Sequence, residues 1–114
     1  MKKIIVLLMI LATGSVFTSC ESTTYCDISY VANPTFTANI GPIVKASCAG
    51  CHSGGKQSNN YVTYTDVKNG MINGDVLCRI DQSQACGRVM PQSGSMPVCT
   101  IDMFKRWADQ GYIN

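Results

Sequence analysis

The sequence is poor in charged residues, in histidine and in long apolar runs. Only 14% of its 114 residues are charged, the formal net charge is +2, and no basic stripe suggests nucleic-acid binding. The longest apolar run, Ile4 to Leu11, is too short to cross a bilayer comfortably. No segment reads as a strand of confident length, and no internal repeat is present. These absences argue against a nucleic-acid-binding protein or a repeat array and leave a small all-α domain as the expected fold class.

The N-terminal segment has the pattern of an export signal. Lys2 and Lys3 precede the apolar run, and Phe17-Thr18-Ser19-Cys20 resembles a bacterial lipoprotein cleavage box, in which the cysteine becomes the lipid-bearing first residue. The alternative is ordinary secretion, with Cys20 left as a disulfide partner. We therefore expect a lipoprotein signal peptide at 1–19, a lipidated flexible tether at 20–34 and one domain at 35–114. The mature chain would have zero net charge and would sit on a membrane, on the periplasmic or cell-surface side.

The chemical signal of the chain is Cys48-Ala49-Gly50-Cys51-His52. Two cysteines at this spacing with a histidine directly after them are what covalent attachment of a c-type haem requires. Cys48 and Cys51 would each bond one vinyl group of the porphyrin, and His52 would be the proximal iron ligand. Because His52 is the only histidine in the chain, one haem is the most that this chemistry can build.

Three other readings of this motif stay open at this stage. A structural zinc site could use both cysteines, His52 and a further cysteine, although ligands adjacent in sequence rarely point at one metal. A thioredoxin-like redox pair needs a βαβ setting, which the pattern does not show. The cysteines could also form ordinary disulfides.

The remaining cysteines agree with export. When Cys20 is assigned to lipid and two cysteines are assigned to haem, four remain, namely Cys26, Cys78, Cys86 and Cys99. An even remainder in a small exported domain predicts two disulfides, with three possible pairings.

Apolar periodicity and turn residues predict four helices. Phe36, Ile40, Ile43 and Val44 share one face of a first helix, which would begin near Ala38 and deliver Cys48 at its end. Residues 53–60 form a loop by composition. A short helix at 63–68 would be closed by Asn69-Gly70, and another at 75–80 would bury Val76, Leu77 and Ile80.

The C-terminal part should be a loop at 81–98 and then the clearest helix. Thr100 is the expected N-cap and Gly111 the expected end of this helix. Its apolar face should pack on the first helix, with Trp107 as the largest buried side chain. Met71 and Met103 lie in or near helical stretches and are expected in the core.

The layout of these elements resembles the class I cytochromes c, and in particular small monohaem cytochrome c lipoproteins of Bacteroidota. The resemblance covers roughly residues 26–114. It is carried by the following stretches: Ile40-Gly41-Pro42-Ile43, Met90-Pro91-Gln92-Ser93-Gly94, Cys99-Thr100-Ile101 and Trp107-Ala108-Asp109-Gln110-Gly111. Ser93 departs from the family's Met-Pro-x-Gly-Gly loop. The resemblance implies a fold of three to four short helices around one covalently bound haem, with many loops.

The same resemblance implies further roles. Two Met-Pro pairs, Met90-Pro91 and Met96-Pro97, compete for the distal ligand. Met90 matches the ligand position of the resembled family, whereas Met96, which precedes Cys99 by only three residues, matches a hydrophobic core position and is the alternative ligand. Cys26 would pair with Cys99, which leaves Cys78 and Cys86 for each other; the main rival is Cys86–Cys99 with Cys26–Cys78. A backbone carbonyl near Pro42 would accept a hydrogen bond from the second His52 nitrogen.

His/Met ligation would fill both axial positions of the iron and leave no open site for a substrate. The expected function is therefore electron transfer rather than enzymatic catalysis, in some cases as the redox partner or subunit of an oxidoreductase, with redox proteins as donor and acceptor. Two alternatives remain: a haem enzyme or gas sensor with a labile or absent methionine ligand, and a haemless, disulfide-stapled interaction module.

Overall fold

The computed structural model describes residues 30–82 and 85–114. In these residues the regular structure is entirely helical, with no strand, so the expectation of an all-α fold is confirmed for them. The helical segments are η2 (Phe36–Ile40), α2 (Gly41–Ser47), α3 (Tyr64–Asn73), α4 (Val76–Ile80) and α5 (Val98–Asp109). The predicted signal peptide, the lipid-bearing Cys20, Cys26 and most of the tether lie outside the described residues.

The first helix starts earlier than the sequence suggested. η2, a short π-helix, runs directly into α2, and the Thr35 hydroxyl caps it by accepting the backbone N–H of Ala38 at 3.2 Å. The expected start near Ala38 is therefore wrong by two residues, because the cap lies before Phe36. Pro42 sits in the first turn of α2, where a missing N–H costs little.

α3 is longer than expected, because Asn69-Gly70 does not end it. The helix begins with a reciprocal capping box between Thr63 and Asp66 and continues to Asn73. A Cβ added to Gly70 would lie 2.6 Å from Cε1 of Tyr61. Gly70 is therefore explained by a close approach between the helix and Tyr61, not by a turn.

α4 and the loop after it follow the prediction closely. α4 begins at Val76 instead of residue 75, and of its apolar residues Ile80 is fully buried, while Val76 and Leu77 are only partly buried against the core. The described residues between α4 and α5 form no helix, as expected for this segment.

α5 also begins earlier than predicted. Its N-cap is Pro97, and Thr100 is buried inside the first turn with its N–H bonded to the Pro97 carbonyl, so the assignment of Thr100 as the cap is wrong. Trp107 is 0% exposed, as expected for the largest core side chain. Its ring lies 6.0 Å from that of Phe36, which confirms the predicted contact between the last helix and the first.

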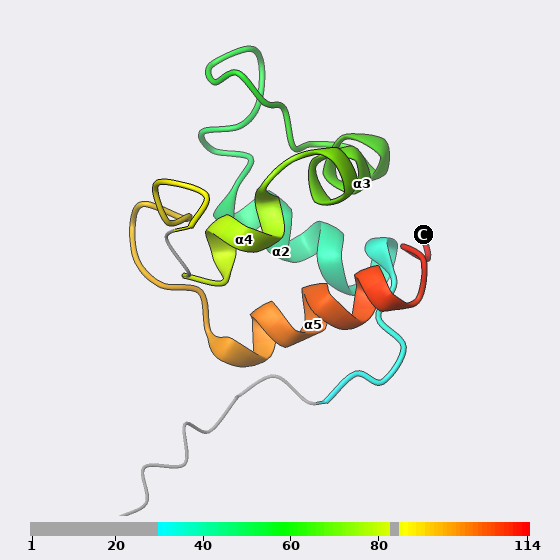
Figure 1. Cartoon of the computed structure of the whole chain (residues 1–114). Coiled ribbons are helices and arrows are strands. Elements are labelled where there is room, and N and C mark those ends of the chain that lie inside the picture. The colour runs from blue at the N-terminus through cyan, green and yellow to red at the C-terminus, as the bar shows by residue number, and fades with distance from the viewer. Residues whose placement is uncertain (1–29, 83–84) are drawn as a thin grey trace, which may run out of the picture.

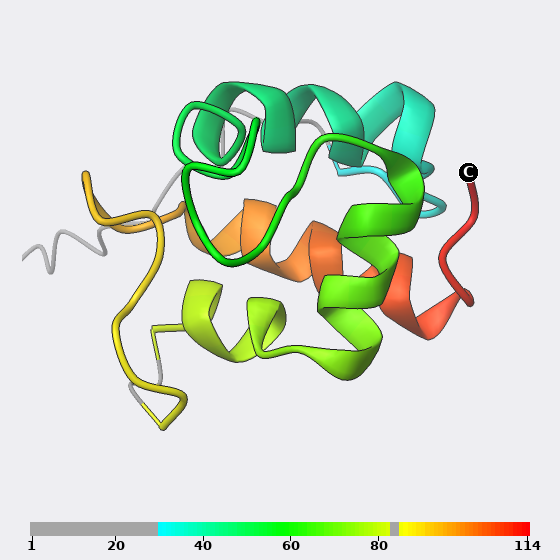
Figure 2. The same ribbon diagram turned by 90° about the horizontal axis from the view of Figure 1, so that it is seen from above.

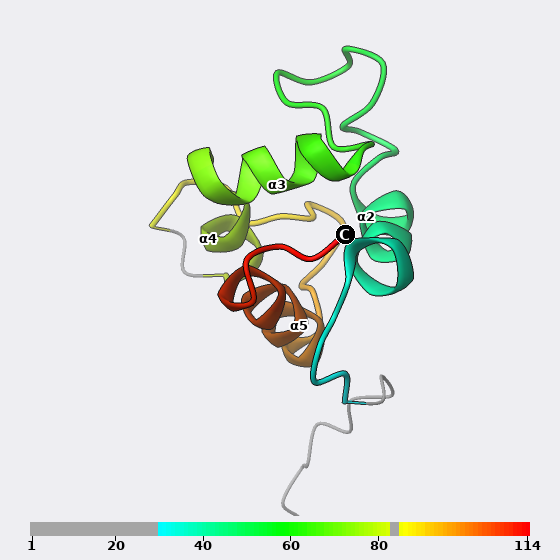
Figure 3. The same cartoon turned by 90° about the vertical axis from the view of Figure 1, so that its right-hand side faces the viewer.

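The helices are arranged around α5. α5 contacts η2 and α4, and α3 contacts α4. Figure 1 shows α5 below α2 and α4, with α3 at the top, and Figure 2 places η2 and α2 on one side of α5 and α4 on the other. In Figure 3 α2 and α4 again lie on opposite sides. None of the helices in the described residues is long and apolar enough to cross a membrane.

Candidate functional site

A cavity of about 580 Å³ lies among α2, α3, α4, α5 and the loop before α5. This volume is within the range of small-molecule and cofactor pockets. Its apolar lining includes the buried side chains Val44, Val67, Ile80 and Phe104. The helices therefore supply a largely apolar chamber that opens to polar loops.

The end of α2 places the two motif cysteines at this cavity. Cys48 is the C-cap of α2, and its carbonyl accepts the N–H groups of Cys51 at 3.1 Å and His52 at 2.9 Å. This tight turn puts Cys48, Cys51 and His52 in the cavity lining. Both cysteines are free thiols, Cys48 partly buried and Cys51 exposed, and burial raises the pKa of the Cys48 thiol.

The His52 ring is held by the loop that follows it. Its Nδ1 lies 2.9 Å from the carbonyl oxygen of Asn59, and since a carbonyl can only accept, Nδ1 carries the proton and donates. The Nε2 lone pair is then available to a metal. Tyr61 supports the same loop, with its N–H donated to the His52 carbonyl at 2.8 Å and its ring 4.9 Å from the imidazole.

This contact corrects one expectation from the sequence. The carbonyl that orients His52 belongs to Asn59, seven residues after the histidine, and not to a residue near Pro42. Asn59 lies in a Ser-, Gly- and Asn-rich loop, whose composition predicts irregular backbone but not which carbonyl faces the ring.

Met90 and Met96 both line the cavity. Met90 is partly exposed, and its N–H donates to the Arg79 carbonyl at 3.0 Å, which fixes this part of the loop to α4. Met96 is 5% exposed and belongs to the hydrophobic core, which agrees with the packing role expected for it. Met71 and Met103 are buried in the core, as predicted, and do not line the cavity.

One charged pair in the cavity wall was not singled out from the sequence. The Nε of Arg79 lies 2.6 Å from Oδ2 of Asp75, and both side chains are about one third exposed. Their i, i+4 spacing is the signal that could have identified the pair. Because the positive and the negative charge are adjacent, the pair adds little net charge to the cavity.

The other described cysteines are disulfide-bonded. Cys78 bonds Cys86 with a Cα–Cα distance of 5.9 Å, the arrangement expected for this pair, and Cys99 is also in a disulfide. The rival pairing of Cys86 with Cys99 is therefore wrong. The proposed partner of Cys99, Cys26, lies outside the described residues, so that pairing stays a prediction.

The structure brings together Cys48, Cys51, His52 and Met90, as the sequence predicted, and adds Met96 to the same cavity. Among residues 30–82 and 85–114, no three His, Cys, Asp or Glu side chains gather where they could hold a metal ion. The zinc site considered above, which needs a third cysteine beside His52, is not formed in this part of the chain. One histidine and one methionine can act as axial ligands where a macrocycle supplies the other four.

Comparisons of the chain with protein-family models, curated proteins and solved structures found no match. The function proposed next therefore depends on the cavity and on the residues that line it.

Proposed function

We propose that this protein is an electron carrier with one covalently attached c-type haem. The observation that carries the proposal is that the two free thiols, Cys48 and Cys51, line the same cavity as His52 and two methionines. The other described cysteines are in disulfides, so the free thiols are the pair that the haem-attachment motif requires.

The residues present fit such a group. Cys48 and Cys51 would hold it through thioether bonds, His52 would supply Nε2 as the proximal ligand, and Met90 would supply the distal sulfur. The Asn59 carbonyl fixes the tautomer and orientation of the imidazole, as the outer hydrogen bond of a metal-bound histidine generally does. When bound, the haem would supply reversible one-electron chemistry at its iron.

The chain's own residues would then tune and protect this centre. Methionine as an axial ligand favours the reduced iron and raises the reduction potential. The buried wall of Val67, Ile80 and Phe104 would give the haem an apolar surface to pack against. With His52 and Met90 both serving as ligands, no position on the iron would be left for a substrate, which favours electron transfer over a haem enzyme or a gas sensor.

The wider setting follows from the sequence. The order of helices, haem motif, Met-Pro loop and last helix fits a class I cytochrome c-like fold. Cys20 would carry lipid and hold the domain on a membrane outside the cytoplasm, where redox proteins would act as donor and acceptor.

The decisive experiment is haem extraction from protein produced in a strain that matures c-type cytochromes. We expect the haem to stay with the polypeptide when the protein is denatured in acid and extracted with organic solvent. A Cys48→Ala/Cys51→Ala variant should lose the haem, whereas Cys78→Ser/Cys86→Ser, the matched control, should keep it. Haem that moves from the parent protein into the solvent would refute the proposal.

A second measurement separates the carrier from the enzyme or sensor. The reduced protein should bind carbon monoxide poorly at neutral pH, because Met90 occupies the sixth position. Rapid and complete binding would favour the gas sensor or haem enzyme instead.

A further inference from the structure

The loop between α4 and α5 carries Met90 and Met96, the two candidate iron ligands. Two hydrogen bonds attach this loop to Arg79 of α4. The Arg79 carbonyl accepts the Met90 N–H at 3.0 Å. The Arg79 guanidinium donates from Nη1 to the Arg88 carbonyl at 3.3 Å. One side chain and its own backbone therefore hold the loop at two positions, one of them Met90 itself.

The guanidinium is in turn oriented from the helix side and fitted against the loop. Its Nε is paired with Asp75, one turn earlier, at 2.6 Å. Gly87, which precedes Arg88, has φ +91°, and a Cβ placed there would lie 3.8 Å from both Nη atoms of Arg79. The loop thus turns closely around the guanidinium, with a glycine where its backbone requires a left-handed conformation.

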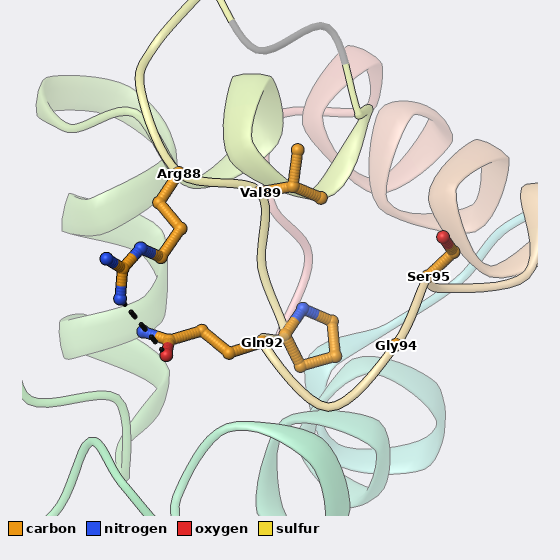
Figure 4. Close-up of a pocket in the computed structure, with 6 residues that line it drawn as sticks. Arg88, Val89, Gln92, Gly94 and Ser95 are labelled. Atoms are coloured by element: carbon orange, nitrogen blue, oxygen red, sulfur yellow. Dashed lines mark hydrogen bonds between the residues drawn. The ribbon is translucent and has the colours of Figure 1, made fainter.

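Two further contacts stiffen the same stretch. The disulfide from Cys78 to Cys86 joins the residue before Arg79 to the residue before Gly87. Within the loop, Nη1 of Arg88 lies 3.3 Å from Oε1 of Gln92, and Figure 4 shows these two side chains facing each other. The loop is therefore cross-linked to α4 on one side of Met90 and braced internally across it.

From these contacts we infer that Arg79 is a positioning residue that holds Met90 in the cavity as the sixth ligand, together with the Cys78–Cys86 disulfide. This role rests on the proposed function, because it needs Met90 to be an iron ligand. The hydrogen-bonded attachment of the loop to α4 is independent of haem, and it can be measured separately.

The test variant is Arg79→Gln, which removes the guanidinium contact with Arg88. Its matched control is Asp75→Asn, which weakens the same ion pair but leaves Arg79 and its contact with the loop in place. Both variants are compared in the parent and in a Met90→Leu background, which has no sulfur at this position to coordinate the iron.

The first measurement is amide hydrogen exchange at Met90 in the purified protein. Arg79→Gln keeps the backbone bond of the Met90 N–H but loses the charged hydrogen bond from the guanidinium to the Arg88 carbonyl, so the loop should open more often. Exchange at Met90 should then be roughly three- to tenfold faster in Arg79→Gln, with a smaller increase in Asp75→Asn. Exchange at Met90 that is unchanged in Arg79→Gln would overturn the inference. This readout needs no haem, so it stays decisive if haem extraction refutes the proposed function.

The second measurement is imidazole binding to the ferric protein, since imidazole must displace the methionine. Arg79→Gln should bind imidazole roughly three- to tenfold more tightly, because the methionine is held less firmly. In the Met90→Leu background the same substitution should change imidazole affinity less than twofold. An equal change in both backgrounds would mean that Arg79 acts on general stability, and the positioning role would be rejected.

Discussion

At the scale of single residues, Met90 and Met96 line one cavity but have different surroundings. Met96 is almost fully buried in the core, whereas Met90 is partly exposed and attached to α4 through its backbone. A substitution that keeps volume and removes sulfur should therefore separate ligation from packing.

We expect Met90→Leu to abolish the weak far-red absorption band of methionine-ligated ferric haem and to lower the reduction potential. Met96→Leu should keep the band and cost less than about 1.5 kcal/mol of stability, since leucine and methionine are similar in volume. Met96→Ala should cost about 2–5 kcal/mol, because it leaves a cavity in the core. Visible spectra, potentiometry and thermal unfolding decide; loss of the band in Met96→Leu alone would reverse the assignment.

The sequence pattern singles out the residues proposed to supply the chemistry, but not the residues that would orient them. Cys48, Cys51 and His52 form a local pattern whose spacing encodes its own geometry. Asn59 and Arg79 would act through a backbone carbonyl or a contact between segments, and such contacts depend on how two parts of the chain meet. Residue type alone carries no signal for that.

At the scale of elements, Gly70 shows how a helix can retain a glycine for packing. Replacement by alanine normally stabilises a helix by about 0.5–1 kcal/mol. Here the added Cβ would lie 2.6 Å from Cε1 of Tyr61 and 2.9 Å from Cγ2 of Val76. Relief of that overlap should cost about 1–3 kcal/mol and displace Tyr61 from His52.

The packing cost outweighs the helix-propensity gain at the middle of both ranges, so we expect Gly70→Ala to lower the free energy of unfolding by about 1 kcal/mol, measured by urea denaturation. Asn69→Ala is the matched control, since Asn69 is exposed in the same helix. Its effect should stay within about 0.5 kcal/mol. A more stable Gly70→Ala protein would contradict the close approach described here.

The capping box of α3 gives a prediction about pH. The backbone N–H of Thr63 donates to the Asp66 carboxylate at 3.0 Å, and this bond holds the pKa of Asp66 below its ordinary value of 3.8. A lowered folded-state pKa means that the contribution to stability is complete above the ordinary value and is lost as pH falls through the folded-state value.

The stability difference between the parent and Asp66→Asn should accordingly be constant from pH 5 to 7 and should shrink below about pH 4. Urea unfolding at a series of pH values measures it. A difference that grows on acidification would show that Asp66 gains no stabilisation from its charged form.

Helix existence was predictable and helix boundaries were not, for reasons visible in three residues. Threonine is a common N-cap residue and glycine is common at helix ends, but Thr100 is buried and Gly70 is packed against Tyr61. The first helix starts at its true cap, Thr35, which precedes the periodic apolar positions. For Thr100 and Gly70, tertiary packing outweighed the local preference. At Thr35 the cap is a local hydrogen bond from the Ala38 N–H, which apolar periodicity does not register.

At the scale of the whole molecule, the contact of the last helix with the first followed from their apolar faces, while the cavity did not. The loop before α5 forms one wall of the cavity and is attached to α4 through the Cys78–Cys86 disulfide and hydrogen bonds with Arg79. Contacts between segments far apart in sequence leave no periodic trace. How a redox partner would dock at the cavity can be argued from the charged residues around it.

Those charges predict how the proposed carrier would exchange electrons. The cavity lining contains one acid and one base, Asp75 and Arg79, which are paired, and the chain without residues 1–19 has seven basic and seven acidic residues. Partners should dock over the cavity edge near Cys51, which is exposed, through a small and short-lived interface. Without a dominant charge, long-range steering contributes little to the encounter.

We therefore expect the rate of oxidation by a small cytochrome or copper protein to change less than about threefold between low salt and about 0.5 M salt. Protein pairs whose association is steered by opposite charges lose much more of their rate over the same range. Stopped-flow measurement at several ionic strengths gives the dependence of the oxidation rate on salt directly. Lys56→Gln is the informative comparison, because the Lys56 ammonium lies 3.4 Å from the Gly50 carbonyl, beside the expected docking edge. A rate that collapses with salt, and that Lys56→Gln slows to the same degree, would reveal a charged docking face and contradict the unsteered encounter.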